Sequence, residues 1–418
     1  MTPNLPSMNA PAPPPLTRFE KLFTAFIVFI PILSYYKSPV SGMNSATFGA
    51  LCFFAWFFIA RPQPSRQRAR FLSPAWLYMA FLSFNVVLTS FLYDYPLLDP
   101  RLLAIVRAFF LFFPILILGA KFFVFPQAVS MLEKLLLASV FWIGVQTVCA
   151  RLLHHPVTGN IPFLVTHEAY KSAGTRPTGF YMETSEFAKN AIMYLCFTLF
   201  GKKALTPRQA RKVLWVVAGI VLSGSGMGYA LLLTGFVVWI FHNVVFKKMT
   251  TGKLLGGTVL IVILVGAGTA YLQTPMGQFA LSRIVSEEED GNLGRWGGQA
   301  LSGRTFSNDA FYRLPDTKKR WGVGFGHVSD VIGQHYTNSL FSHLITCGYA
   351  CIPVWLAMLG IIFWRGDMRI KVFSVVYAAL LCISACGNPM GISYYFSFLL
   401  SGAVFTAKRG NREIEIHA

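Results

Sequence analysis

Long apolar segments recur along this chain of 418 residues, and they constrain its fold more than any other feature. Each segment is about 17–25 residues long, the length of helix that crosses the hydrocarbon core of a bilayer. Hydrophobic residues make up 54% of the chain and charged residues only 13%. The sequence therefore predicts an all-α polytopic membrane protein.

The charges between the apolar segments predict how the chain is threaded. Five short segments are basic and are expected on the cytoplasmic side, namely 61–70, 202–212, 247–253, 365–371 and 408–412. Because 202–212 and 247–253 share a side, the chain must turn back between them, and "SGSGMG" at 223–228 is the expected turn. Twelve transmembrane spans follow, at 19–36, 43–60, 74–93, 102–120, 128–150, 187–201, 213–223, 228–246, 254–272, 344–364, 372–388 and 391–406.

This threading predicts one transmembrane domain at 19–406 with both termini in the cytoplasm. Residues 1–18 form a proline-rich, disordered tail without the basic region that leads a signal peptide, and 407–418 form a second tail. Longer outward loops are expected at about 151–186 and 273–343. The net charge of +19 does not indicate a nucleic-acid partner, because the basic residues cluster in short loops.

The segment "RPTGFYMETSEFAKN" places charged side chains beside an apolar segment, which is costly and therefore suggests function. Arg176 either anchors the helix at the membrane edge or holds a phosphate with its planar guanidinium. Pro177 and Gly179 predict a fixed turn beside it. Thr184 or Ser185 is the expected N-cap of the next helix.

Three further charges follow Arg176 in this segment. Glu186 and Lys189 are spaced to form a structural ion pair on one helix face. Glu183 stands outside the helix without an evident local partner, so we expect it to act as a base or to orient an acceptor.

Other candidates are scattered along the chain. Arg304 follows a Ser-Gly turn, and His335 and Asn338 precede the apolar segment at 344–364, where they could orient a hydroxyl group and accept its proton. His343 lies eight residues after His335 and could share its helix face. Arg107, inside an apolar segment, needs a partner or water and is either structural or a substrate-orienting residue.

Several motifs are absent from the sequence. It contains no Asp-x-Asp, no GxxxxGK[ST] phosphate loop and no GxSxG nucleophile motif. We therefore expect neither a metal nor a cofactor. A diphosphate bound here would have to be neutralised by arginines, which form charge-assisted hydrogen bonds with it.

Five segments in order resemble the O-antigen polymerase and ligase superfamily of bacterial inner-membrane proteins: "RPTGFYMETSEFA", "SGSGMGYALLL", "SGRTF", "GVGFGHVSDV" and "HYTNSLFSHLITCGYACIPVWL". The resemblance covers about 170–365 and implies a fold similar to C-type glycosyltransferases, with a site facing the periplasm. It departs from the family at "SGSGMG", where many members have Ser-Arg, and at Thr184, where a proline is common.

The resemblance implies a metal-independent glycosyltransferase with an undecaprenyl-diphosphate-linked oligosaccharide as donor. Carried over by position, Arg176 and Arg304 would bind diphosphate and His335 would act on the acceptor. The expected function is polymerisation of repeat units into exopolysaccharide or O-antigen, with a chain-length regulator and a flippase as possible partners. The alternatives are an O-antigen ligase and, in another class, a transporter of lipid-linked oligosaccharide.

Overall fold

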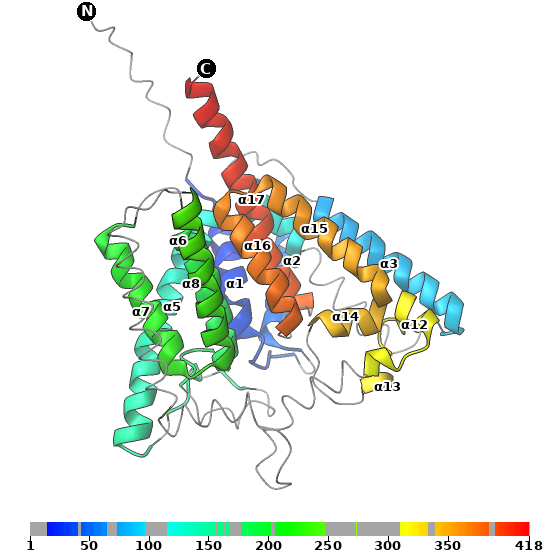
Figure 1. Cartoon of the computed structure of the whole chain (residues 1–418), viewed down its shortest axis with the longest axis horizontal. Coiled ribbons are helices and arrows are strands. Elements are labelled where there is room, and N and C mark those ends of the chain that lie inside the picture. The colour runs from blue at the N-terminus through cyan, green and yellow to red at the C-terminus, as the bar shows by residue number, and fades with distance from the viewer. Residues whose placement is uncertain are drawn as a thin grey trace, which may run out of the picture.

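The computed structural model describes residues 15–40, 43–64, 73–96, 115–155, 157–161, 164–166, 177–181, 183–201, 205–246, 273, 310–332, 339–383 and 389–417. Within these ranges the chain is mostly helical, and its only β-structure is a pair of isolated bridges. The helices lie side by side as a bundle, with three short helices at one end (Figure 1).

The helices follow the predicted apolar segments closely. They are α1 (Arg18–Leu33), α2 (Ser45–Ala60), α3 (Ser73–Tyr93), α5 (Phe125–Leu152), α6 (Thr184–Leu199), α7 (Pro207–Ser223), α8 (Gly226–Phe246), α15 (Cys351–Arg365), α16 (Met368–Ile383) and α17 (Pro389–His417). The short elements are α12 (Asp316–Trp321), α13 (Val328–Ile332), α14 (Ser339–Cys347) and the 3-10 turn η2 (Gly348–Ala350).

Among the described residues, three helices are long and apolar enough to cross a membrane, which supports a membrane protein. They are Ser73–Tyr93, Phe125–Ala150 and Ser339–Arg365, the last combining α14, η2 and α15. Shorter apolar helices lie at Ser45–Ala60, Gly226–Phe236 and Gly391–Phe405. The predicted number of twelve spans is not confirmed. The predicted span at 254–272 and most of the one at 102–120 lie outside the described residues.

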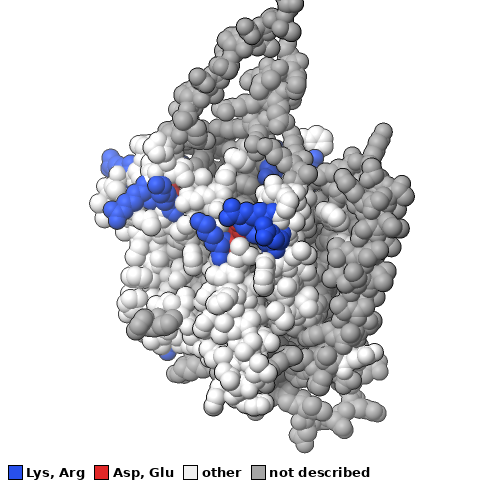
Figure 2. Space-filling view, turned by 90° about the vertical axis from the view of Figure 1, so that its left-hand side faces the viewer, with Lys and Arg blue, Asp and Glu red and all other residues white. Residues whose placement is uncertain are grey.

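The surface of the bundle is suited to lipid. Phe91 is 88% exposed and Trp364 is 86% exposed, and other large apolar side chains are exposed along the same helices. Such an extended apolar surface marks an interaction with a membrane or a partner. On the described surface in Figure 2, lysine and arginine side chains gather in a band toward the upper end, and few charged residues lie below it.

The predicted break at "SGSGMG" is confirmed. Helix α7 ends at Ser223, Gly224 follows in the left-handed conformation with φ 64°, and α8 begins at Gly226. Glycine adopts this conformation without the steric cost of a Cβ atom, so it is a common helix terminator. Ser225 directly precedes α8, and its hydroxyl accepts a hydrogen bond from the Gly228 amide in the first turn of the helix at 3.2 Å.

Aromatic residues form much of the interior. Phe197 of α6 lies 5.1 Å from Phe125 of α5 and 5.1 Å from Phe373 of α16, and its ring stacks on that of Phe398 of α17 at 5.9 Å, all between ring centroids. Edge-to-face and offset aromatic pairs add to the stabilisation from burial. These contacts hold α6 in the middle of α5, α16 and α17.

The segment 310–332 is attached to the end of α3. Asn85 of α3 donates a hydrogen bond from Nδ2 to the Trp321 carbonyl at 2.8 Å, and the Tyr93 hydroxyl donates to the Gly322 carbonyl at 3.0 Å. The Val323 amide donates to the Ile345 carbonyl of α14 at 2.8 Å. The described part of the predicted outward loop is thus a docked, partly helical segment, whereas the sequence predicted only a long loop.

The predicted threading can be tested by finding on which side of the membrane two positions lie. Tyr312 of the docked segment is exposed, and Arg208 lies in the first turn of α7, whose basic start is predicted to be cytoplasmic. In a chain without its seven native cysteines, a cysteine at position 312 should react with a membrane-impermeant maleimide added to the outer side of the membrane. One at position 208 should react only after the membrane is permeabilised. Equal labelling of both positions, or the reverse pattern, would show that the threading is wrong.

Candidate functional site

The start of α6 differs from the expected cap. Glu183, not Thr184 or Ser185, occupies the N-cap position, with extended backbone and no side-chain capping bond. Its carbonyl accepts hydrogen bonds from the Glu186 and Phe187 amides at 3.1 and 3.3 Å. The carboxylate is exposed, and the Ser185 hydroxyl donates to it at 3.0 Å, so Glu183 has the local partner that the sequence did not reveal.

The turn before α6 determines where Glu183 lies. Gly179 has φ 66°, and its amide donates to Oε1 of Gln146 on α5 at 2.9 Å. A side-chain carbon at Gly179 would lie only 2.8 Å from Cβ of Ser139, also on α5. The turn therefore needs glycine both for its backbone conformation and for its close approach to α5.

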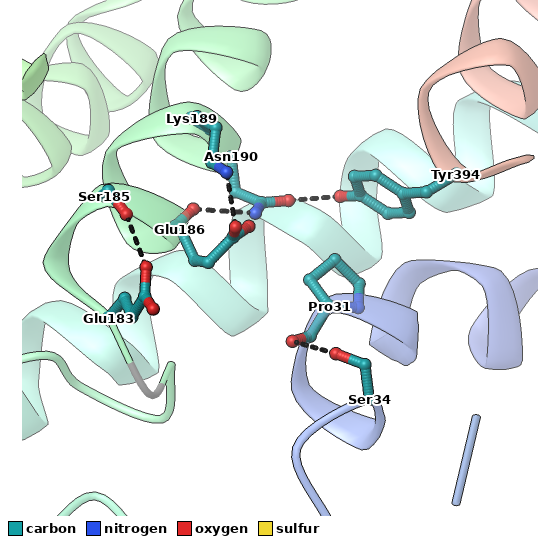
Figure 3. Close-up of polar contacts among 8 residues, drawn as sticks. All are labelled: Pro31, Ser34, Glu183, Ser185, Glu186, Lys189, Asn190 and Tyr394. Atoms are coloured by element: carbon teal, nitrogen blue, oxygen red, sulfur yellow. Dashed lines mark hydrogen bonds and ion pairs between the residues drawn. The ribbon is translucent and has the colours of Figure 1, made fainter. Parts of the chain in front are cut away.

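A buried polar group lies one turn into α6. Lys189 forms an ion pair with the Glu186 carboxylate, which confirms the predicted pairing. Asn190 donates from Nδ2 to the Glu186 carbonyl at 2.8 Å and accepts a hydrogen bond from the Tyr394 hydroxyl of α17. Figure 3 shows these side chains converging between α6 and α17, with Glu183 and Ser185 on the other side of Glu186. Figure 3 also shows the end of α1, where the Ser34 hydroxyl donates to the Pro31 carbonyl at 3.2 Å.

Tyr181 is a buried neighbour of this group. Burial raises the pKa of its phenol, and the negative charge of Glu186 raises it further. It therefore stays neutral and keeps its proton to donate. Among the described residues its hydroxyl has no hydrogen-bond partner, nor has the buried hydroxyl of Ser139. A buried donor without a partner is costly, so the region before the start of α6 has the capacity to bind one more acceptor.

The glycines of "GVGFGH" build a second feature, which the sequence singled out only as part of a resemblance. Gly322, Gly324 and Gly326 have φ of 84°, 87° and 85°. A side-chain carbon at Gly322 would overlap the Thr346 carbonyl, and one at Gly324 would lie 2.8 Å from the Thr89 hydroxyl. The spacing of three glycines before His327 is the signal that could have identified this loop as a built element.

Two helical contacts bring the two features into one bundle. Tyr394 bonds Asn190 of α6, and Phe396, two residues later on α17, lies 6.0 Å from the Trp355 ring of α15. The Trp355 ring in turn lies 5.2 Å from that of His343 on α14. Carbonyl groups of α14 accept backbone hydrogen bonds from the segment 322–327, which we call the glycine loop. Helix α17 therefore connects the start of α6 to the glycine loop.

His343 has a structural role. It is buried, its Nδ1 donates to the Ser339 carbonyl at 2.6 Å, and its Nε2 accepts from the Tyr78 hydroxyl at 3.1 Å. Both ring nitrogens are therefore occupied, and the ring joins α14 to α3.

Of the predicted site residues, only Glu183 lies within the described ranges. Arg176, Arg304, His335, Asn338 and Arg107 lie outside the described residues. Their predicted roles stay predictions. Among the described residues, no three His, Cys, Asp or Glu side chains gather in a group that could hold a metal ion.

Comparisons with known proteins add no family to these observations. The sequence matches no family model and no curated protein, and the fold matches no solved structure.

The ion pair of α6 predicts a measurable loss of stability. The Lys189 side chain is 3% exposed, whereas Lys212, which pairs with Glu133 between α7 and α5, is 29% exposed. Lys189→Met would leave Glu186 without its partner and should destabilise the folded protein by about 3 kcal/mol. Lys212→Met is the matched control and should cost about 1 kcal/mol or less.

Thermal unfolding of the purified protein in detergent measures both effects. The double variant Lys189→Met/Glu186→Gln should recover much of the loss, because no unpaired charge then remains. Equal unfolding temperatures for the two lysine variants would contradict a buried role for Lys189.

Proposed function

We propose that this protein is a metal-independent glycosyltransferase that polymerises repeat units carried on undecaprenyl diphosphate, at the periplasmic face of the bacterial inner membrane. A hydroxyl group of one glycan attacks the anomeric carbon of another. The new glycosidic bond forms as the bond to the diphosphate breaks, and the lipid diphosphate leaves with the electron pair. The product glycan is one repeat unit longer.

The observation that carries the proposal is the state of Glu183. Its carboxylate is exposed and lies directly before a helix whose next two charges, Glu186 and Lys189, neutralise each other. Among the described residues Glu183 accepts only the Ser185 hydroxyl, so it is available to a substrate. Rigid placement supports a site, because the turn that carries it is held against α5 by Gly179.

Further support comes from the order of the motifs. The segment with Glu183, the break at "SGSGMG" and the glycine loop before α14 occur in the order of the polymerase and ligase superfamily. The glycine loop and the start of α6 are both built elements of the apolar bundle, linked through α17. A catalytic site of this class needs such preorganised donors and acceptors in surroundings that exclude water.

The residues outside the described ranges complete the proposal. Arg176 and Arg304 would bind the diphosphate through their planar guanidinium groups, and Arg107 could supply the positive charge that "SGSGMG" lacks. On sequence grounds the base is Glu183 or His335, with Asn338 orienting the acceptor.

The products made by the purified protein test the reaction. Incubated with an undecaprenyl-diphosphate-linked oligosaccharide, the protein should yield a ladder of glycans on a gel, with or without a chelator. A strain lacking the gene should accumulate single repeat units on lipid. Full-length polymer on the lipid carrier would instead identify a ligase, and unprocessed units on the cytoplasmic side would identify a transporter.

The diphosphate contacts are tested by substitution. Arg176→Ala and Arg304→Ala should nearly abolish the ladder while the protein still inserts, because each removes a bidentate donor. The lysine variants should keep partial activity, since a point charge replaces the planar fork. Arg208→Ala, at the predicted cytoplasmic end of α7, is the matched control and should polymerise normally. A normal ladder from both of the first two variants would rule out the arginine clamp.

Glu183→Gln distinguishes the two bases. If Glu183 accepts the proton, this variant should slow transfer by about 10²–10⁴-fold without weakening donor binding. His335→Ala would then have a smaller effect on the rate of transfer. The opposite ranking would assign the base to His335.

A further inference from the structure

The glycine loop presents one histidine in a defined orientation. Nδ1 of His327 lies 3.0 Å from Oδ2 of Asp330, one helical turn along the chain at the start of α13. The imidazole ring stacks on the ring of Tyr95 with centroids 3.8 Å apart and an interplanar angle of 12°. Two contacts, one polar and one aromatic, therefore determine where the ring lies.

The pairing with Asp330 determines the tautomer. A carboxylate accepts hydrogen bonds, so Nδ1–H of the neutral ring donates to Asp330 and the lone pair is left on Nε2. Among the described residues Nε2 has no hydrogen-bond partner. His343 differs in this respect, because both of its ring nitrogens are hydrogen-bonded inside the bundle.

The His327 ring is held rigidly but remains close to the protein surface. The His327 side chain is 8% exposed and that of Asp330 is 48% exposed, so the dyad lies at the surface of the docked segment. The loop cannot relax easily, because the Gly324 amide donates to the Thr346 carbonyl at 3.0 Å and the Tyr93 hydroxyl holds Gly322. A rigid loop with a histidine oriented by a carboxylate is the arrangement that positions a general base.

We propose that His327 is the general base of the transfer reaction and that Asp330 orients it. This rests on the proposed function and replaces Glu183 and His335 as candidates for the base. Glu183 then keeps its alternative role of orienting the acceptor, so Glu183→Gln should slow transfer less than His327→Gln. The acceptor hydroxyl gives its proton to Nε2 as its oxygen bonds the anomeric carbon, and the bond to the diphosphate breaks. Asp330 is a positioning residue, which also stabilises the imidazolium that forms. Tyr95 supports the ring by stacking.

Single-turnover transfer by the purified full-length protein, with an undecaprenyl-diphosphate-linked oligosaccharide as donor, tests the assignment. His327→Gln should lower the rate by about 10²–10⁴-fold while the donor dissociation constant stays unchanged. Asp330→Asn should lower the rate less than His327→Gln. Asp316→Asn is the matched control, because its side chain is 91% exposed on the same docked segment, and it should react at the wild-type rate.

Two measurements separate a base from a structural residue. Imidazole added to the buffer should restore part of the activity of His327→Ala, which a loss of packing would not allow. If the His327 variants fail to fold, Asp330→Asn decides, because Asp330 is half exposed and its replacement leaves the loop glycines in place.

The failures of the two proposals differ. If the wild-type protein transfers no glycan, the proposed function is wrong. If it does, and both His327→Gln and Asp330→Asn react at the wild-type rate, the function stands and the assignment of the base is overturned.

Discussion

The cost of placing polar groups in an apolar bundle governs the rest of this structure. Lys189 and Asn190 of α6 are buried, so an unpaired charge or amide at either position would be strongly destabilising. Both are paired, Lys189 with Glu186 on its own helix and Asn190 with Tyr394 on α17. The hydrogen bond between Asn190 and Tyr394 therefore fixes the position of α6 along α17. Apolar packing is non-directional and would specify that position less strictly.

The same constraint explains how the docked segment is held. Its backbone groups find partners on two neighbours: Asn85 and Tyr93 of α3 bond carbonyl groups, and α14 carbonyls accept the loop amides. Glycines with positive φ permit the close approach that these bonds require. An irregular segment at this place is stable because its hydrogen-bonding groups are paired within the protein.

These contacts orient functional side chains at two chemically different places in the bundle. At the start of α6, an exposed carboxylate precedes a neutralised ion pair, and a buried phenol lacks a partner among the described residues. In the glycine loop, an imidazole is oriented by a carboxylate and supported by an aromatic ring. Both positions lie in one bundle, linked through α17, and under the proposed function either could act on the acceptor hydroxyl.

The sequence by itself determined the local features of this protein. Apolar segments of spanning length predicted where the helices lie, "SGSGMG" predicted the break between α7 and α8, and i,i+3 spacing predicted the pair of Glu186 and Lys189. Such features depend on residues within a few positions of each other. The N-cap was predicted wrongly because Glu183, Thr184 and Ser185 are all polar, and docking of Gly179 on α5 decides among them.

Only the tertiary structure decided which distant residues meet. Asn190 and Tyr394 are 204 positions apart, Asn85 and Trp321 are 236 apart, and Tyr78 and His343 are 265 apart. Hydropathy cannot predict these partners, because a helix that is apolar on all sides does not indicate which face meets which neighbour. The orientation of His327 is likewise tertiary, since its loop takes its shape from α3 and α14.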